Sequence, residues 1–181
     1  MEMQLINETL FKDYSPIKED TIITKFVPYI NIAQKLYIEK ILGKPLTEEL
    51  QDQIKAASQE GATGDEITPD NQALILKIAP ALSFYAVYEG LPSHWLSIVN
   101  KGVTLRDSEN SAPASYKDIS WYMRILKDKA EVLASDLIEY LCGCKYKYPL
   151  WQPGRGCGCG GTDSEGSAIN PLDAGIFIPK K

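Results

Sequence analysis

Apolar side chains recur at helical spacing in four stretches of the chain, separated by short segments rich in glycine, proline and polar residues. Steps of three and four residues place apolar side chains on one face of a helix and predict that this face packs on a core. The pattern predicts helices at 21–42, 45–59, 69–89 and 115–142. They would make up about half of the chain, above the roughly one-third that is usual in globular proteins.

Glycine and proline refine the boundaries of these helices. Gly43 followed by Pro45 is typical of a helix that ends and a new one that starts. Pro28 either kinks the first helix or marks its true first turn, and Pro80 predicts a kink in the third. The segment Gly90-Leu91-Pro92 is expected to end the third helix.

The last predicted helix carries the most regular pattern in the chain. Its apolar positions alternate steps of four and three residues, which predicts a long helix with one continuous buried stripe. Ser115 and Asp118 have the spacing of a capping box at its start, with Asp where Glu or Gln is usual. We expect Leu126 and Leu133 to be core residues. The stripe consists of Ile119, Met123, Leu126, Ala130, Leu133, Leu137 and Tyr140.

Three segments do not follow a helical pattern. Residues 1–18 predict an irregular or extended N-terminal lead-in. Residues 98–114 predict a loop or short hairpin within a helical domain at 19–144, because β-branched residues flank Asn100-Lys101-Gly102. Residues 145–181 are rich in glycine and proline and predict an extended C-terminal arm. The fold class is therefore mainly α: a small helical bundle with a loop or short hairpin insertion and an extended arm.

Large apolar side chains in the arm indicate that it packs on another protein surface. A glycine-rich segment cannot offset its own chain entropy, whereas each large apolar side chain brings about 1.5–3 kcal/mol when it is buried. We expect the arm to dock on a neighbouring subunit or partner, and its removal to leave the bundle folded while abolishing assembly. The expected interaction residues are Trp151, Ile176, Phe177 and Ile178.

Composition and charge narrow the classes of function. The chain has 181 residues, of which 44% are hydrophobic and 24% charged, the balance of one soluble globular domain. A formal net charge of −5 argues against a protein that grips nucleic acid through clustered lysine and arginine. No apolar run is expected to reach the roughly 18 residues of a membrane span, and no secretory signal is expected.

Residues for catalysis are scarce. His94 is the single histidine, although histidine is the usual acid–base side chain near neutral pH. It lies at an expected turn without a nucleophile motif nearby, and we interpret it as a packed or solvated turn residue. No glycine-rich nucleotide motif opens a helix. We therefore expect no catalytic residues, no cofactor-binding residues and no enzymatic activity.

Four cysteines form two C-x-C pairs, Cys142 with Cys144 and Cys157 with Cys159. Four thiolates suit a closed structural zinc site, which could tie the arm to the end of the last helix. The usual zinc pair has two to four intervening residues, so a single one is less typical. Free thiols in a reducing compartment are the favoured state, and a disulfide between the pairs is the other alternative. Structural zinc is the one cofactor that the sequence leaves open.

Part of the sequence resembles a known family. The signature I-x-x-I-L-G-x-P-L-x-x-x-L runs from Ile38 to Leu50. It is joined by the middle helix ending near Tyr85–Gly90 and by the long last helix followed by Tyr148-Pro149-Leu150. With these features, residues 20–150 resemble the small helical head–tail connector proteins of tailed bacteriophages, also called adaptor or neck-ring proteins, in the version found in phages and prophages of Bacteroidales-type bacteria.

The resemblance implies a structural virion protein that assembles in the cytoplasm of the host bacterium. Members of that family dock under the portal and present a surface to the tail. For this chain the resemblance implies a homo-oligomer, a dodecameric ring, that binds the portal protein and tail or further neck proteins, with no membrane contact. DNA would pass through the ring without sequence-specific contact, because copies that each carry a charge of −5 would repel it.

Two other classes of function stay open. One is a zinc-stapled helical interaction module of a bacterial cell, with the arm folded on the metal. The other is an enzyme subunit whose chemistry lies on a partner. A metal assay distinguishes the first from a connector, and a size measurement distinguishes a ring from a monomer.

Overall fold

The computed structural model describes residues 3–17, 23–59, 65–99, 102–105 and 115–152, and these residues are mainly helical, as predicted. Short 3₁₀ or π turns lie between some of the helices and after the last one. The elements are α1 (Glu8–Tyr14), a 3₁₀ turn (Ile23–Lys25), α2 (Val27–Ala33), a π turn (Gln34–Ile38), α3 (Glu39–Leu42), α4 (Lys44–Ala57), α5 (Pro69–Trp95), β1 (Leu96–Val99), β2 (Gly102–Leu105), α6 (Tyr116–Gly143) and a 3₁₀ turn (Lys145–Lys147).

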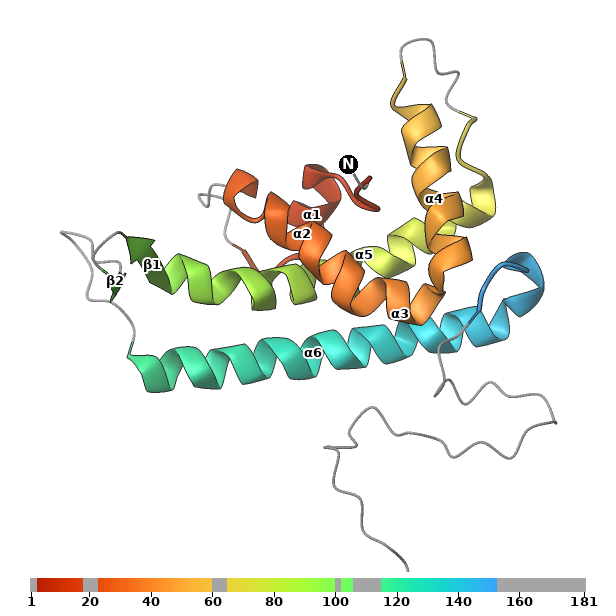
Figure 1. Ribbon diagram of the computed structural model, residues 1–181. Helices are drawn as coiled ribbons and strands as arrows, with labels where there is room; N and C mark the ends of the chain where they lie inside the picture. Colours follow the sequence, from red (N-terminus) through yellow and green to blue (C-terminus); the bar gives the residue numbers. More distant parts are fainter. Residues whose placement is uncertain (1–2, 18–22, 60–64, 100–101, 106–114, 153–181) are drawn as a thin grey trace, which may run out of the picture.

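Helices α5 and α6 form a long antiparallel pair on which the other helices are placed (Figure 1). Helices α1 and α2 pack on α5, and α4 stands at an angle to the pair (Figure 1). At the end where α5 leads towards α6, β1 and β2 form an antiparallel hairpin in which Leu96 pairs with Leu105 and Val99 with Gly102. Of the two predicted alternatives for this insertion, the structure has the hairpin.

The predicted helices at 45–59 and 115–142 correspond closely to α4 and α6. The capping box of α6 is complete: the Ser115 hydroxyl accepts from the backbone N–H of Asp118, and the Asp118 carboxylate accepts from the backbone N–H of Ser115. The first predicted helix is divided into α2, the π turn and α3. Pro28 lies in the first turn of α2, so it marks a helix start and not a kink.

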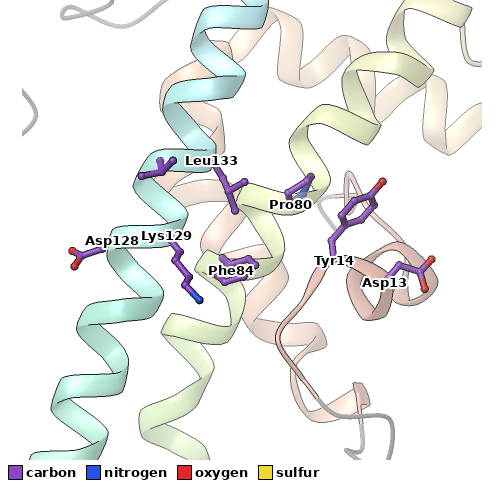
Figure 2. A pocket seen from close by; sticks show the side chains of 8 residues that line it. Asp13, Tyr14, Pro80, Phe84, Asp128, Lys129 and Leu133 are labelled. Atoms are coloured by element: carbon purple, nitrogen blue, oxygen red, sulfur yellow. The ribbon is translucent and has the colours of Figure 1, made fainter.

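Helix α5 does not end at Gly90, as the sequence predicted, but continues to Trp95. A Cβ atom at position 90 would lie 2.8 Å from Cδ1 of Phe26, which is too close for a side chain. Gly90 therefore serves close packing between α5 and Phe26 instead of helix termination. One turn later, the half-buried ring of His94 stacks on Phe26 with centroids 4.1 Å apart. Figure 2 shows the axis of α5 changing direction close to Pro80, where the sequence predicted a kink.

The expected extended lead-in is wrong for residues 8–14, which form α1. The side chain of Asn7 caps this helix by accepting from the backbone N–H of Leu10 at 2.9 Å. Phe11 is fully buried, and so are Leu5 and Ile6 just before the helix. A helix of two turns is too short to show a clear period, so its capping residue is the local signal.

Helix α5 contradicts the expectation that no apolar stretch reaches the length of a membrane span. Its residues Pro69–His94 are long and apolar enough to cross a membrane by length and composition alone. However, 61% of its most apolar window is buried inside the structure, as in the core helix of a globular protein. Buried residues from α1, α2 and α6 surround it, which accounts for its apolar composition without a membrane.

Candidate interaction surfaces

Trp151, predicted to bind a neighbouring subunit, packs into its own chain. Its side chain is 4% exposed and belongs to the core. Its indole N–H donates to the carbonyl oxygen of Ile41 at 2.9 Å. The prediction for Trp151 is therefore wrong, because the bundle itself supplies the partner. Ile176, Phe177 and Ile178 lie outside the described residues.

A second anchor fixes the same segment three residues earlier. The hydroxyl of buried Tyr148 donates to the backbone oxygen of Asp70 at 2.8 Å, at the start of α5. Lys147 forms a 2.7 Å ion pair with the Asp70 carboxylate, which raises the pKa of the lysine. Burial and the hydrogen bond with Tyr140 raise the pKa of Tyr148. We call residues 145–152 the C-terminal strap, since they contact the end of α3 and the start of α5.

The glycine of the sequence signature lies under this strap. Gly43 has a positive φ of 77°, which an L side chain rarely adopts, and it connects α3 to α4. A Cβ atom at this position would lie 2.5 Å from the backbone oxygen of Gln152. Two separate features therefore require glycine at position 43. The turn between the helices needs the positive φ, and the strap leaves no room for a side chain.

The candidate zinc ligands are only partly described. Cys142 and Cys144 are half-buried at the end of α6, while Cys157 and Cys159 lie outside the described residues. Cys142 is disulfide-bonded and Cys144 is a free thiol. Within the described ranges no group of three or more potential ligands is close enough to hold a metal ion. The disulfide at Cys142 corrects the favoured expectation of a free thiol at this position, whereas Cys144 is a free thiol as expected. A zinc site would require the Cys142 thiolate, so zinc binding stays a prediction for the reduced protein.

An open apolar groove of about 580 Å³ lies where α1, α5 and α6 meet, and we call it the α1 groove. Figure 2 shows Leu133 of α6 and Phe84 of α5 between the two helices, with Tyr14 of α1 beyond Pro80. Asp128 and Asp13 lie at opposite rims of the groove (Figure 2). The lining residues are Asp13, Tyr14, Pro80, Phe84, Asp128, Lys129, Val132 and Leu133.

The exposed side of α6 extends this apolar surface. Trp121 is 65% exposed and Val132 62% exposed. They are eleven residues apart, which is close to three helical turns, so both lie on the same side of the helix. The buried stripe occupies another side, through Leu126, Ala130, Ala134, Leu137 and Leu141. The sequence signal for this surface was the presence of apolar residues outside the predicted stripe, and the surface was not predicted.

A second groove of about 570 Å³ lies on the other side of the α5–α6 pair, and we call it the tyrosine groove. The rings of Tyr37 and Tyr85 stack in it with centroids 4.0 Å apart and planes 3° apart. The Tyr37 hydroxyl donates to the Glu89 carboxylate at 2.6 Å. The lining residues are Leu36, Tyr37, Lys40, Ile41, Tyr85, Lys127, Glu131, Ala134, Ser135 and Ile138.

Both tyrosines of this groove are held in the neutral form. Burial raises the pKa of Tyr37, and the hydrogen bond to Glu89 adds to the increase. Burial also raises the pKa of Tyr85 to about 12, with a further contribution from the charge of Glu131. Neutral, stacked tyrosines are packing elements at neutral pH, with the polar hydroxyl of Tyr37 already occupied by Glu89.

The described part of the chain is therefore mainly helical, with an open groove on each side of its longest helix pair. It belongs to a family described as a family of unknown function, DUF6712, whose model matches residues 38–161. The match covers α3 to α6 and the C-terminal strap. No curated protein and no solved structure matches the chain.

Proposed function

We propose that this chain is a structural head–tail connector subunit of a tailed bacteriophage, which forms a ring beneath the portal and joins the capsid to the tail. The observation that carries the proposal is the pair of open grooves on opposite sides of the α5–α6 pair, one of them apolar and one of mixed lining. An open apolar groove such as the α1 groove is a place where another protein surface can dock, and a ring subunit carries such docking places for its neighbours.

The sequence resemblance supports the same function. It covers residues 20–150, which include α2 to α6 and most of the strap. A ring subunit needs two lateral surfaces for its neighbours and an end for the portal or the tail. The α5–α6 pair supplies the two lateral surfaces, and the hairpin β1–β2 projects at one end of the pair (Figure 1).

The proposal is tested by electron microscopy of the full chain, alone and mixed with the portal protein from the same genome. We expect closed rings, on the portal or free, and the protein in purified virions by mass spectrometry. A zinc assay of the same preparation examines the alternative of a zinc-stapled module. Absence of rings with and without the portal, together with absence from virions, would contradict the proposal.

A further inference from the structure

We propose that the two grooved sides of the molecule form one interface between successive copies of this chain. In this interface, the helical ridge beside the tyrosine groove of one copy seats in the α1 groove of the next. The ridge consists of Ile32, Leu36 and Lys40, each four residues after the last. The inference rests on the proposed function in one respect, namely that this interface builds the connector ring.

The shapes of the two surfaces fit this arrangement. Ile32 and Leu36 are each 41% exposed and lie one turn apart, so they form an apolar ridge on α2 and the π turn. The α1 groove is open and has a floor of Phe84 and Leu133 between two helices. Helices pack by placing the ridge of one in the groove of another, so a helical ridge is the natural occupant.

The charges of the two surfaces are complementary. The α1 groove carries two carboxylates, Asp13 and Asp128, against one ammonium group, that of Lys129. The lining of the tyrosine groove has the opposite balance, with two lysines against Glu131. Lys127 already lies 3.6 Å from Glu131 within α6, whereas Lys40 has no ion pair within the described part of the chain. Lys40 is therefore the cation available to a neighbour's Asp128.

The positions of the two surfaces determine what kind of assembly results. On α6, the α1 groove uses Asp128, Lys129, Val132 and Leu133, whereas the tyrosine groove uses Lys127, Glu131, Ala134, Ser135 and Ile138. These sets fall on opposite flanks of the buried stripe, so the two grooves do not overlap. When the ridge of one copy pairs with the α1 groove of the next, the growing assembly always has an unoccupied groove at one end and an unoccupied ridge at the other. Such a contact is heterologous and generates a ring when the rotation closes.

The test is charge reversal followed by sedimentation velocity of the full chain over a concentration series. Asp128→Lys or Lys40→Glu should each weaken self-association by about tenfold, because like charges then meet across the interface. Matched controls on α4, Asp52→Lys and Lys55→Glu, make the same charge changes at exposed positions outside both grooves. The controls should associate like the parent protein.

Mixing the two single variants provides the decisive measurement. In an equimolar mixture, copies can alternate so that every contact pairs opposite charges, and association should return to the parent level. Higher salt should weaken the parent assembly, since exposed charges are screened within about 10 Å at 0.1 M salt. Circular dichroism melting confirms that each variant is folded.

Each outcome bears on one claim. If the parent associates and neither reversal weakens it, or if mixing fails to restore association, this interface is wrong while the proposed connector function stands. If the parent stays monomeric at every concentration, the interface is wrong as a contact between copies. If reversal and mixing behave as expected but microscopy shows open chains instead of rings, the interface stands and the proposed ring is wrong.

Discussion

The indole N–H of Trp151 donates a 2.9 Å hydrogen bond to the carbonyl oxygen of Ile41, 110 residues earlier in the chain. This contact places the strap in the core of the bundle and next to Gly43, the glycine of the helix–glycine–helix signature. The boundary predicted between a folded domain ending at 144 and a separate arm therefore lies too early. Core residues continue at least to Trp151.

Trp151→Ala should destabilise the protein by about 3–5 kcal/mol, the usual cost of deleting a buried aromatic side chain. Trp151→Phe keeps most of the apolar burial but leaves the Ile41 carbonyl without its donor, so its cost should be smaller. Urea unfolding followed by circular dichroism measures both. Tyr146→Ala is the control, because that side chain is 80% exposed. Equal stability of Trp151→Ala and the parent would show that the strap does not contribute to the fold.

Two truncations should behave differently. Under reducing conditions, which open the disulfide of Cys142 in the full chain, a chain that ends after Gln152 keeps Tyr148 and Trp151 in the core and should unfold at a temperature close to that of the full chain. A chain that ends after Cys144 loses both side chains and the ion pair between Lys147 and Asp70, so it should be clearly less stable. This second expectation reverses the one drawn from the sequence. Thermal melting of the two truncated chains, compared with the full chain, checks it.

Substitutions along α6 should separate its buried stripe from its groove side. Leu126 is 1% exposed, and Leu126→Ala should cost about 2–5 kcal/mol. Leu133 is half-buried and lines the α1 groove, so Leu133→Ala should cost less in the isolated protein. The sequence predicted both residues to be in the core, and therefore similar costs. Denaturant unfolding of the two variants measures the difference, and an equal loss would mean that the α1 groove is closed in solution.

The sequence predicted the fold wherever a long periodic pattern was present, as in α4 and α6. It failed where a distant contact decides the local structure. Gly90 is typical of a helix end, but Phe26 requires a glycine within the helix at that point. Trp151 lies in a segment whose glycine and proline content predicted a separate arm, but its partner Ile41 is far away in the sequence. The grooves were missed for the same reason, since each combines residues from three or more separate elements.

Gly90→Ala tests the close packing of α5 on Phe26. Alanine favours a helix over glycine by about 1 kcal/mol, so an unconstrained position would be stabilised. Here the new Cβ atom would lie 2.8 Å from the Phe26 ring, and we expect a net loss of about 1–3 kcal/mol through overpacking. The double variant Gly90→Ala with Phe26→Leu should show a smaller loss than the sum of the two single changes. Additive losses in urea unfolding would argue against the contact.

Alkaline pH should destabilise the protein through its buried tyrosines. The pKa of Tyr85 is about 12 in the folded chain, against 10.0 without burial. Between these values the unfolded state binds fewer protons than the folded state, so the free energy of unfolding falls as pH rises. The raised pKa values of Tyr37, Tyr148 and Lys147 act in the same direction.

Tyr85→Phe isolates one part of this effect. Phenylalanine keeps the stacked ring and cannot ionise, so the variant should lose less stability than the parent between about pH 10 and pH 12. Urea unfolding from neutral pH upward measures the slope, and phenolate absorbance follows ionisation directly. Tyr146→Phe, at a position that is 80% exposed, should leave the slope unchanged. A slope that is the same in the Tyr85→Phe variant and the parent would show that Tyr85 ionises equally in both states and is accessible to solvent.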